Sequence, residues 1–198
     1  MNFLAHLYLS RHDDELMIGN FIADSVKGGQ WKEYDVGVAN GIRMHRMIDD
    51  FTDKHPVFRS SAALIRPSLG KYAGVVTDIF YDHFLAADFN SHSDESLPEF
   101  TSRVHALLRS HESMMPQRSQ FFLKYMLLKN IPLPYASREG IGMVLTGMSR
   151  RANFDNTMHE GVKYLDKHYE ELRSHFQKFF PEIIAFLEEK KESFTPVS

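Results

Sequence analysis

The chain has 198 residues, of which 43% are hydrophobic and 25% charged, with a net charge of −3 and no cysteine. This balance is typical of a globular protein and excludes both a disulfide framework and a thiolate zinc site. The negative charge argues against general nucleic-acid binding, and no apolar stretch approaches the roughly 18 residues that cross a bilayer. The opening "MNFLAHLYLS" lacks the basic segment and cleavage site of a secretory signal, so we expect a cytoplasmic protein.

Helical patterns follow one another along the chain. The first has acids in its first turn, a basic residue in its last turn and two glycines after it, as expected of a helix with defined ends. The predicted helices cover residues 13–29, 35–51, 56–65 (ending before Pro67), 71–89, 96–112, 116–130, 137–152, about 156–178, and 182–192 after Pro181. Strand alternation, repeats and linkers are lacking, so the sequence predicts a single all-α helical domain over residues 1–198.

Charge is distributed unevenly along the chain. Residues 1–100 carry a net charge of −6, whereas residues 101–154 hold eight Lys and Arg against two Glu, a net charge of +6. A basic middle in an acidic protein predicts a surface for an acidic partner. The alternative is a solvated surface whose charges scatter once the chain is folded.

Two aspartates lie within an apolar stretch, "DIFYDHFLA" at residues 78–86. At 3.6 residues per turn, Asp78 and Asp82 share one helical face with Leu85, and His83 is turned by about 100° from Asp82. A carboxylate in apolar surroundings is costly unless its charge is compensated. This helix therefore predicts a buried polar site.

Three other segments also direct polar side chains toward the predicted interior. His45 and Asp49 share a stripe with apolar residues, Asp24 shares a face with Asn20, and His6 stands among leucines and alanine. Taken singly, each has a structural explanation: a core histidine with a satisfied hydrogen bond, a helix cap, or a local ion pair. Together they are harder to explain in this way.

Several aspartates converging in one core repel each other unless a cation is present. Carboxylate and imidazole ligands without thiolate suit Mn²⁺, Fe²⁺ or Mg²⁺. Helices that present His and Asp inward are an established scaffold for such a site. The sequence therefore predicts a metal centre within a helical bundle.

Long stretches of the sequence closely resemble the bacterial acyl carrier protein phosphodiesterases: "MNFLAHLYLS", "IGNFIADSVKG", "GIRMHRMIDDFTDKHP", "YAGVVTDIFYDHFLA" and "LTGMSRRANFDN". The resemblance implies an HD-domain-like all-helical fold, although the His-Asp doublet usual in HD-domain phosphohydrolases stands here reversed, as Asp82-His83. It implies hydrolysis of the phosphodiester that joins 4′-phosphopantetheine to a serine of holo-acyl carrier protein. The expected cofactor is Mn²⁺, with Mg²⁺ or Fe²⁺ also possible, and no membrane or nucleic acid is involved.

With this reaction in view, we expect a metal-activated water to attack the phosphodiester. The residues expected to hold the metal at the core of the site are Asp24, His45, Asp78 and Asp82. His6 and His83 are expected either as further ligands or as groups that orient a carboxylate or a water. Asp49 is expected to hold His45 in one tautomer.

Three arginines are candidates for substrate contacts. We expect Arg150 and Arg151 to contact either the phosphate or the acidic carrier protein, since a positive face would steer an acidic partner toward the enzyme. Arg46 is a second candidate for the phosphate.

Two other functions fit the same residues. One is a metal-dependent phosphohydrolase acting on a nucleotide or another small phosphoester, which would need no basic docking face. The other is a non-catalytic helical protein that binds acyl carrier protein, in which the Asp and His residues form only a structural polar core. Metal analysis of the purified protein distinguishes the non-catalytic binding protein from the metal-dependent enzymes.

Overall fold

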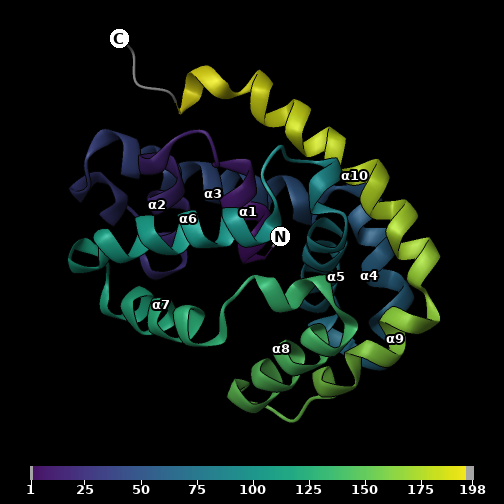
Figure 1. Ribbon diagram of the computed structural model, residues 1–198. Helices are drawn as coiled ribbons and strands as arrows, with labels where there is room; N and C mark the ends of the chain where they lie inside the picture. Colours follow the sequence, from purple (N-terminus) through teal and green to yellow (C-terminus); the bar gives the residue numbers. More distant parts are fainter. Residues whose placement is uncertain (1, 195–198) are drawn as a thin grey trace.

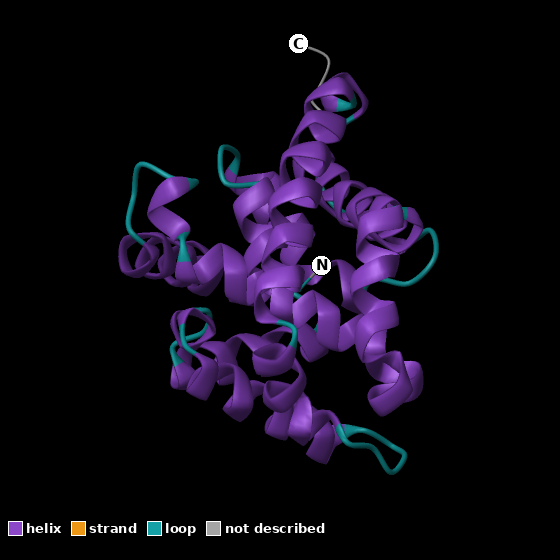
Figure 2. Ribbon diagram, turned by 90° about the vertical axis from the view of Figure 1, so that its right-hand side faces the viewer, coloured by secondary structure: helices purple, strands orange, loops and turns teal. Residues whose placement is uncertain are grey.

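The computed structural model describes residues 2–194, and within that range every regular element is helical (Figure 2). The predicted all-α fold is therefore confirmed. None of the helices in the described part of the chain combines the length and apolarity that would carry it across a membrane.

Ten α-helices make up the described chain, and short 3₁₀ turns connect several of them. Their bounds are α1 (Phe3–Leu9), α2 (Asp14–Ile22), α3 (Val36–Lys54), α4 (Pro56–Leu69), α5 (Ala73–Ala87), α6 (Leu97–Ser110), α7 (Gln117–Lys129), α8 (Arg138–Arg151), α9 (Gly161–Lys167) and α10 (Tyr169–Glu189). Two of the 3₁₀ turns matter below, Ala23–Ser25 after α2 and Leu133–Ala136 before α8.

Helix α5 lies at the centre of the bundle. It packs against α1, α4, α8 and α10, and α10 runs along one side of the molecule past α4 and α5 (Figure 1). Val76, Ile79 and Phe80 are completely buried, in agreement with a helix that is apolar almost all round. Polar side chains on α5 therefore meet different neighbours according to the side from which they project.

Two glycines allow α2 and α3 to cross in backbone contact. A Cβ atom on Gly19 would lie 2.0 Å from the Val38 carbonyl oxygen, and one on Gly41 would lie 2.3 Å from the Leu16 carbonyl oxygen. Neither position therefore has room for a side chain. This close crossing sets the separation of the two helices, which carry several of the candidate site residues.

Three predicted helix ends differ from the structure. The first predicted helix ends at Ile22 and continues only as a 3₁₀ turn. Helix α4 continues through Pro67 and ends where Gly70 takes a positive φ of 54°. Likewise α10 passes through Pro181, and the break lies earlier, at His168. Burial of the apolar stripe of α10 outweighs the one backbone hydrogen bond that proline removes.

Candidate metal centre

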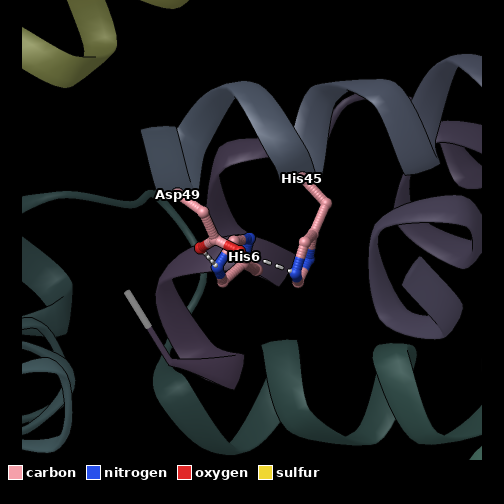
Figure 3. A group of neighbouring side chains, drawn as sticks. All are labelled: His6, His45 and Asp49. Atoms are coloured by element: carbon pink, nitrogen blue, oxygen red, sulfur yellow. Dashed lines mark hydrogen bonds and ion pairs between the residues drawn. The ribbon is translucent and has the colours of Figure 1, made fainter. Parts of the chain in front are cut away.

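Three of the polar side chains meet between α1 and α3 (Figure 3). His6 comes from α1, and His45 and Asp49 lie one turn apart on α3. One donor atom from each lies within 4.8 Å of the others. Asp49 is 3.1 Å from His6 Nε2 through Oδ1 and 3.1 Å from His45 Nε2 through Oδ2. A single carboxylate thus faces both imidazoles.

Asn20, on α2, binds the opposite nitrogen of both rings. Its Oδ1 lies 2.9 Å from His6 Nδ1 and 2.9 Å from His45 Nδ1. Its Nδ2 donates to the His6 carbonyl oxygen at 2.9 Å, which defines the orientation of the amide. Because an amide oxygen only accepts hydrogen bonds, both Nδ1 atoms carry the proton. Both Nε2 atoms are therefore directed at Asp49.

The two imidazoles differ in protonation state because their surroundings differ. Burial, together with the nearby His45, lowers the pKa of His6 to about 4, so that His6 is neutral at neutral pH. Burial also acts to lower the pKa of His45, but hydrogen bonds with Asp24 and Asp49 outweigh it and raise that pKa to about 9. Burial acts to raise the pKa of Asp49, but hydrogen bonds with His45 and His6 outweigh it and hold that pKa well below its usual range.

Asp24 adds a second carboxylate at the mouth of the site. It lies in the 3₁₀ turn after α2, with Oδ1 3.4 Å from His45 Nε2, and this hydrogen bond lowers its pKa. The Asp24 side chain is 67% exposed and that of Asp49 is 43% exposed, against 5% for His6 and 11% for His45. The imidazoles therefore form the floor of the site, and the carboxylates face solvent.

The donor set suits a divalent cation. Neutral His6 keeps its one proton on Nδ1, so its Nε2 lone pair faces a carboxylate oxygen of Asp49 at 3.1 Å. Two acceptors in this position attract a cation between them. The cavity that these side chains line, together with Asn20 and Asp24, has a volume of about 70 Å³. This space suffices for an ion and a water, and the N and O donors suit Mn²⁺, Fe²⁺ or Mg²⁺.

Comparison with known proteins identifies the family. The sequence model of the acyl carrier protein phosphodiesterases matches residues 1–183. This chain belongs to the acyl carrier protein phosphodiesterase family. Curated acyl carrier protein phosphodiesterases of Photorhabdus laumondii and Enterobacter are each 32% identical to it, over 96% of this chain and over 96% and 100% of their own lengths. That of Yersinia enterocolitica is 30% identical, over 96% of this chain and 100% of its own.

No solved structure matches the chain. Every residue predicted for the site falls within the range that matches the acyl carrier protein phosphodiesterases. The structure divides these residues into those that meet at the His6–His45 cavity and those that lie elsewhere.

Asp82 does not line the cavity and lies at the start of α1. It is completely buried, and its two carboxylate oxygens accept hydrogen bonds from the backbone N–H groups of Leu4 at 2.8 Å and Ala5 at 3.2 Å. Burial raises the pKa of Asp82 to about 7, against the opposing effect of these two N–H groups. Among residues 2–194, Asp82 thus lies outside the group whose donor atoms converge, and it caps the helix that carries His6.

Asp78 does not line the cavity. Burial raises its pKa, and the negative charge of Asp49 acts in the same direction. Among residues 2–194, Asp78 is outside the group whose donor atoms converge. It also raises the pKa of Asp82, as expected for two carboxylates on one face of α5.

His83 projects from another side of α5 and does not line the cavity. Its Nδ1 donates to the Tyr135 carbonyl oxygen at 2.8 Å, and its Nε2 lies 3.1 Å from the Tyr169 hydroxyl. Burial lowers its pKa. His83 therefore joins α5 to the 3₁₀ turn before α8 and to the first residue of α10.

The three arginines also lie outside the cavity. Arg46 donates through Nη1 to the Gly28 carbonyl oxygen and through Nη2 to that of Val26, at 2.9 and 3.0 Å, so it holds a loop. Arg150 and Arg151 lie in the last turn of α8 and line a separate groove. None of the three therefore stands in the cavity where a phosphate would meet the donor atoms.

Two residues have a larger part in the site than the sequence indicated. Asp49 contacts both imidazoles, although its position on one stripe with His45 predicted only a role in holding that ring. Asn20 was visible as a neighbour of Asp24 on α2, but no motif marks an amide that binds two histidines at once. The sequence offered only an asparagine directly after Gly19, and the structure shows that Asn20 is buried at the close crossing of α2 and α3.

Proposed function

We propose that this protein hydrolyses the phosphodiester that joins 4′-phosphopantetheine to a serine of holo-acyl carrier protein. The products are apo-acyl carrier protein and free 4′-phosphopantetheine. The observation that carries the proposal is the pair of imidazole Nε2 atoms directed at one carboxylate on a solvent-facing cavity. The family to which the chain belongs supports the choice of substrate.

The cofactor in this proposal is a divalent cation, Mn²⁺ first, with Mg²⁺ or Fe²⁺ as substitutes. His6 Nε2, His45 Nε2 and Asp49 would hold it, with Asp24 as a further carboxylate at the mouth. When bound, such an ion lowers the pKa of a water and neutralises charge on the phosphate. Its ligands must be unprotonated, which Asp49 and His6 already are at neutral pH.

The remaining roles fall to the residues of the chain themselves. Asn20 keeps the Nδ1 proton of both histidines in place, so that Nε2 is the atom each ring would offer to the ion: His6 already has a lone pair there, and His45 gains one when it loses its second proton. Asp82 caps α1 and thereby holds His6 against α3. The half-exposed Asp49 and the exposed Asp24 leave the mouth open to a phosphodiester on the surface of another protein.

The decisive experiment is incubation of metal-free protein with holo-acyl carrier protein, with and without Mn²⁺, followed by mass spectrometry of the carrier. We expect loss of 4′-phosphopantetheine only with the metal, and no loss with Asp49→Ala. The matched control is Asp50→Ala on the same helix, because Asp50 is exposed and pairs with Lys54 at 2.6 Å. Full activity after rigorous chelation, or in Asp49→Ala, would overturn the metal-centred mechanism. Equal activity on a small phosphodiester would favour a small-molecule phosphohydrolase.

A further inference from the structure

Exposed apolar side chains gather where the chain is most basic. Of the six large hydrophobic side chains exposed in residues 2–194, four lie between residues 121 and 154: Phe121, Leu128, Met143 and Phe154. The segment 101–154 carries the net charge of +6. Aromatic residues, methionine and arginine together are typical of protein interfaces.

Met143 lines a groove between α7 and α8, and Phe121 and Leu128 lie on the helix that forms its other wall. On α7, Phe121, Tyr125 and Leu128 share one helical face, and Tyr125 and Lys129 line the groove. On the opposite wall the spacing is the same, and Met143, Gly147, Arg150 and Arg151 share one face of α8. The groove has a volume of about 760 Å³. We call Phe121, Leu128, Lys129, Met143, Arg150 and Arg151 the α7–α8 face.

The cations of this face have no acidic partner. Two arginines elsewhere in the described chain do pair with acids, Arg103 with Glu95 and Arg138 with Asp166. Within residues 2–194, no ion pair involves Lys129, Arg150 or Arg151, and the Arg151 guanidinium instead lies 5.3 Å from the Tyr125 ring centroid. An acidic partner would supply the missing charges.

Helix α7 packs against one of the residues that line the metal cavity and against the turn that carries Asp24. Phe3, which lines the cavity, stacks on Phe122 of α7 with ring centroids 4.0 Å apart. Ser119 of the same helix donates to the Ser25 hydroxyl at 2.8 Å, one residue from Asp24. One turn beyond Phe122, Tyr125 reaches the groove. A partner seated on the α7–α8 face therefore lies next to the mouth of the cavity.

We propose that the α7–α8 face docks an acidic amphipathic helix of the protein substrate, which presents its phosphodiester to the neighbouring cavity. The inference rests on the proposed function, and it names the surface that selects a carrier protein over a small phosphodiester. An amphipathic helix laid in a groove is a common mode of recognition. A concave site between two helices favours this partner over an anionic membrane, which would meet a convex apolar face.

The test measures binding of holo-acyl carrier protein by fluorescence anisotropy over a salt series. It also measures kcat/KM for that carrier and for a small diester of 4′-phosphopantetheine with a serine peptide. In the double variant Arg150→Glu, Arg151→Glu, the ratio of the two kcat/KM values should fall about tenfold or more, with weaker salt dependence of carrier binding. The matched control, Arg173→Glu with Lys178→Glu on α10, makes the same charge change on another exposed helix and should leave the ratio unchanged.

The apolar part of the face is tested separately. Leu128→Ser should weaken carrier binding, whereas Val36→Ser, at a similarly exposed valine, should not. Unchanged carrier binding in both α7–α8 variants would overturn the inference even if the wild-type protein hydrolyses the carrier. Loss of binding to phosphatidylglycerol vesicles, with carrier binding intact, would assign the face to a membrane instead. Absence of hydrolysis by the wild-type protein would contradict the proposed function, while the binding assay still tests the docking face.

Discussion

The imidazole rings of His6 and His45 stack with centroids 4.0 Å apart and planes inclined by 20°. Two rings that both carried a positive charge would repel each other in this position, and the structure avoids this by keeping His6 neutral. The shared Asn20 oxygen aligns their Nδ1 atoms on one side, so that both Nε2 atoms emerge on the other. Asn20 is therefore a positioning residue whose loss should disturb both rings together.

Replacing Asn20 by leucine should lower Mn²⁺ affinity about 10- to 100-fold, because both imidazoles lose the acceptor that fixes their tautomer. Isothermal titration calorimetry of the metal-free protein measures this directly. Asn40→Leu is the control, since Asn40 is a buried asparagine on α3 that does not line the cavity. Equal Mn²⁺ affinity in Asn20→Leu and the wild-type protein would show that Asn20 does not position the rings.

Replacing Asp82 by alanine should destabilise the protein by about 1–3 kcal/mol, because two buried N–H groups of α1 lose their acceptor. Asp82→Asn keeps one acceptor oxygen and should cost less. Urea unfolding of the metal-free proteins measures both changes. Undiminished stability in Asp82→Ala, combined with lost Mn²⁺ binding, would instead return Asp82 to the ligand set.

Replacing His83 by leucine should leave Mn²⁺ affinity unchanged while lowering the free energy of unfolding by about 1–3 kcal/mol. The cause is loss of its bonds to the Tyr135 carbonyl and the Tyr169 hydroxyl. His6→Leu serves as the contrasting variant, in which Mn²⁺ affinity should fall. A large drop in Mn²⁺ affinity for His83→Leu would contradict its placement outside the site.

The stability of the metal-free protein should depend on pH through both histidines. The pKa of His45 rises from 6.5 unfolded to about 9 folded, so its contribution is complete below pH 6.5 and is lost as pH rises through 9. The pKa of His6 falls to about 4, so its contribution is complete above pH 6.5 and is lost as pH falls through 4. Each contribution is about 3 kcal/mol at most.

Urea unfolding across this pH range should therefore give a maximum near pH 6.5, the unfolded value for both rings. His45→Gln should flatten the alkaline side and leave the acidic side in place. An alkaline decline of the same size in that variant would assign the effect to other groups.

Binding of Mn²⁺ at neutral pH should release about one proton, because His45 is protonated in the metal-free site and must be neutral to act as a ligand. Calorimetric titrations in two buffers of different ionisation enthalpy give the number of protons released. Asp50→Ala should release the same number. Binding without proton release would mean that His45 stays protonated and is not a ligand.

Helical periodicity predicted which polar residues face the interior, but not which neighbour each one meets. On α5, Asp82 and His83 are buried and Asp78 is partly buried. Because α5 is surrounded by four helices, Asp82 meets the N-terminus of α1, whereas His83 meets Tyr169 at the start of α10. Such partners depend on tertiary packing over long sequence separations, which periodicity does not contain.

Some helix ends and the composition of the site also depend on tertiary packing, which the local sequence does not contain. The preference of proline for helix ends predicted breaks at Pro67 and Pro181. Both helices continue through these prolines, because each buries a long apolar stripe. By contrast, the pairing of His45 with Asp49 follows from i, i+4 spacing and was available from the sequence. The meeting of His6 with that pair depends on how α1 packs, and the structure supplies it.

The glycines at the crossing of α2 and α3 have a consequence for the chemistry as well as for the packing. Gly19 precedes Asn20, and Gly41 lies one turn before His45, so the distance between amide and imidazole is set by two peptide backbones in contact. A single methyl group at either position would act as a spacer between the helices. A substitution at Gly19 or Gly41 would therefore change the distance between the metal ligands, although every donor atom would still be present.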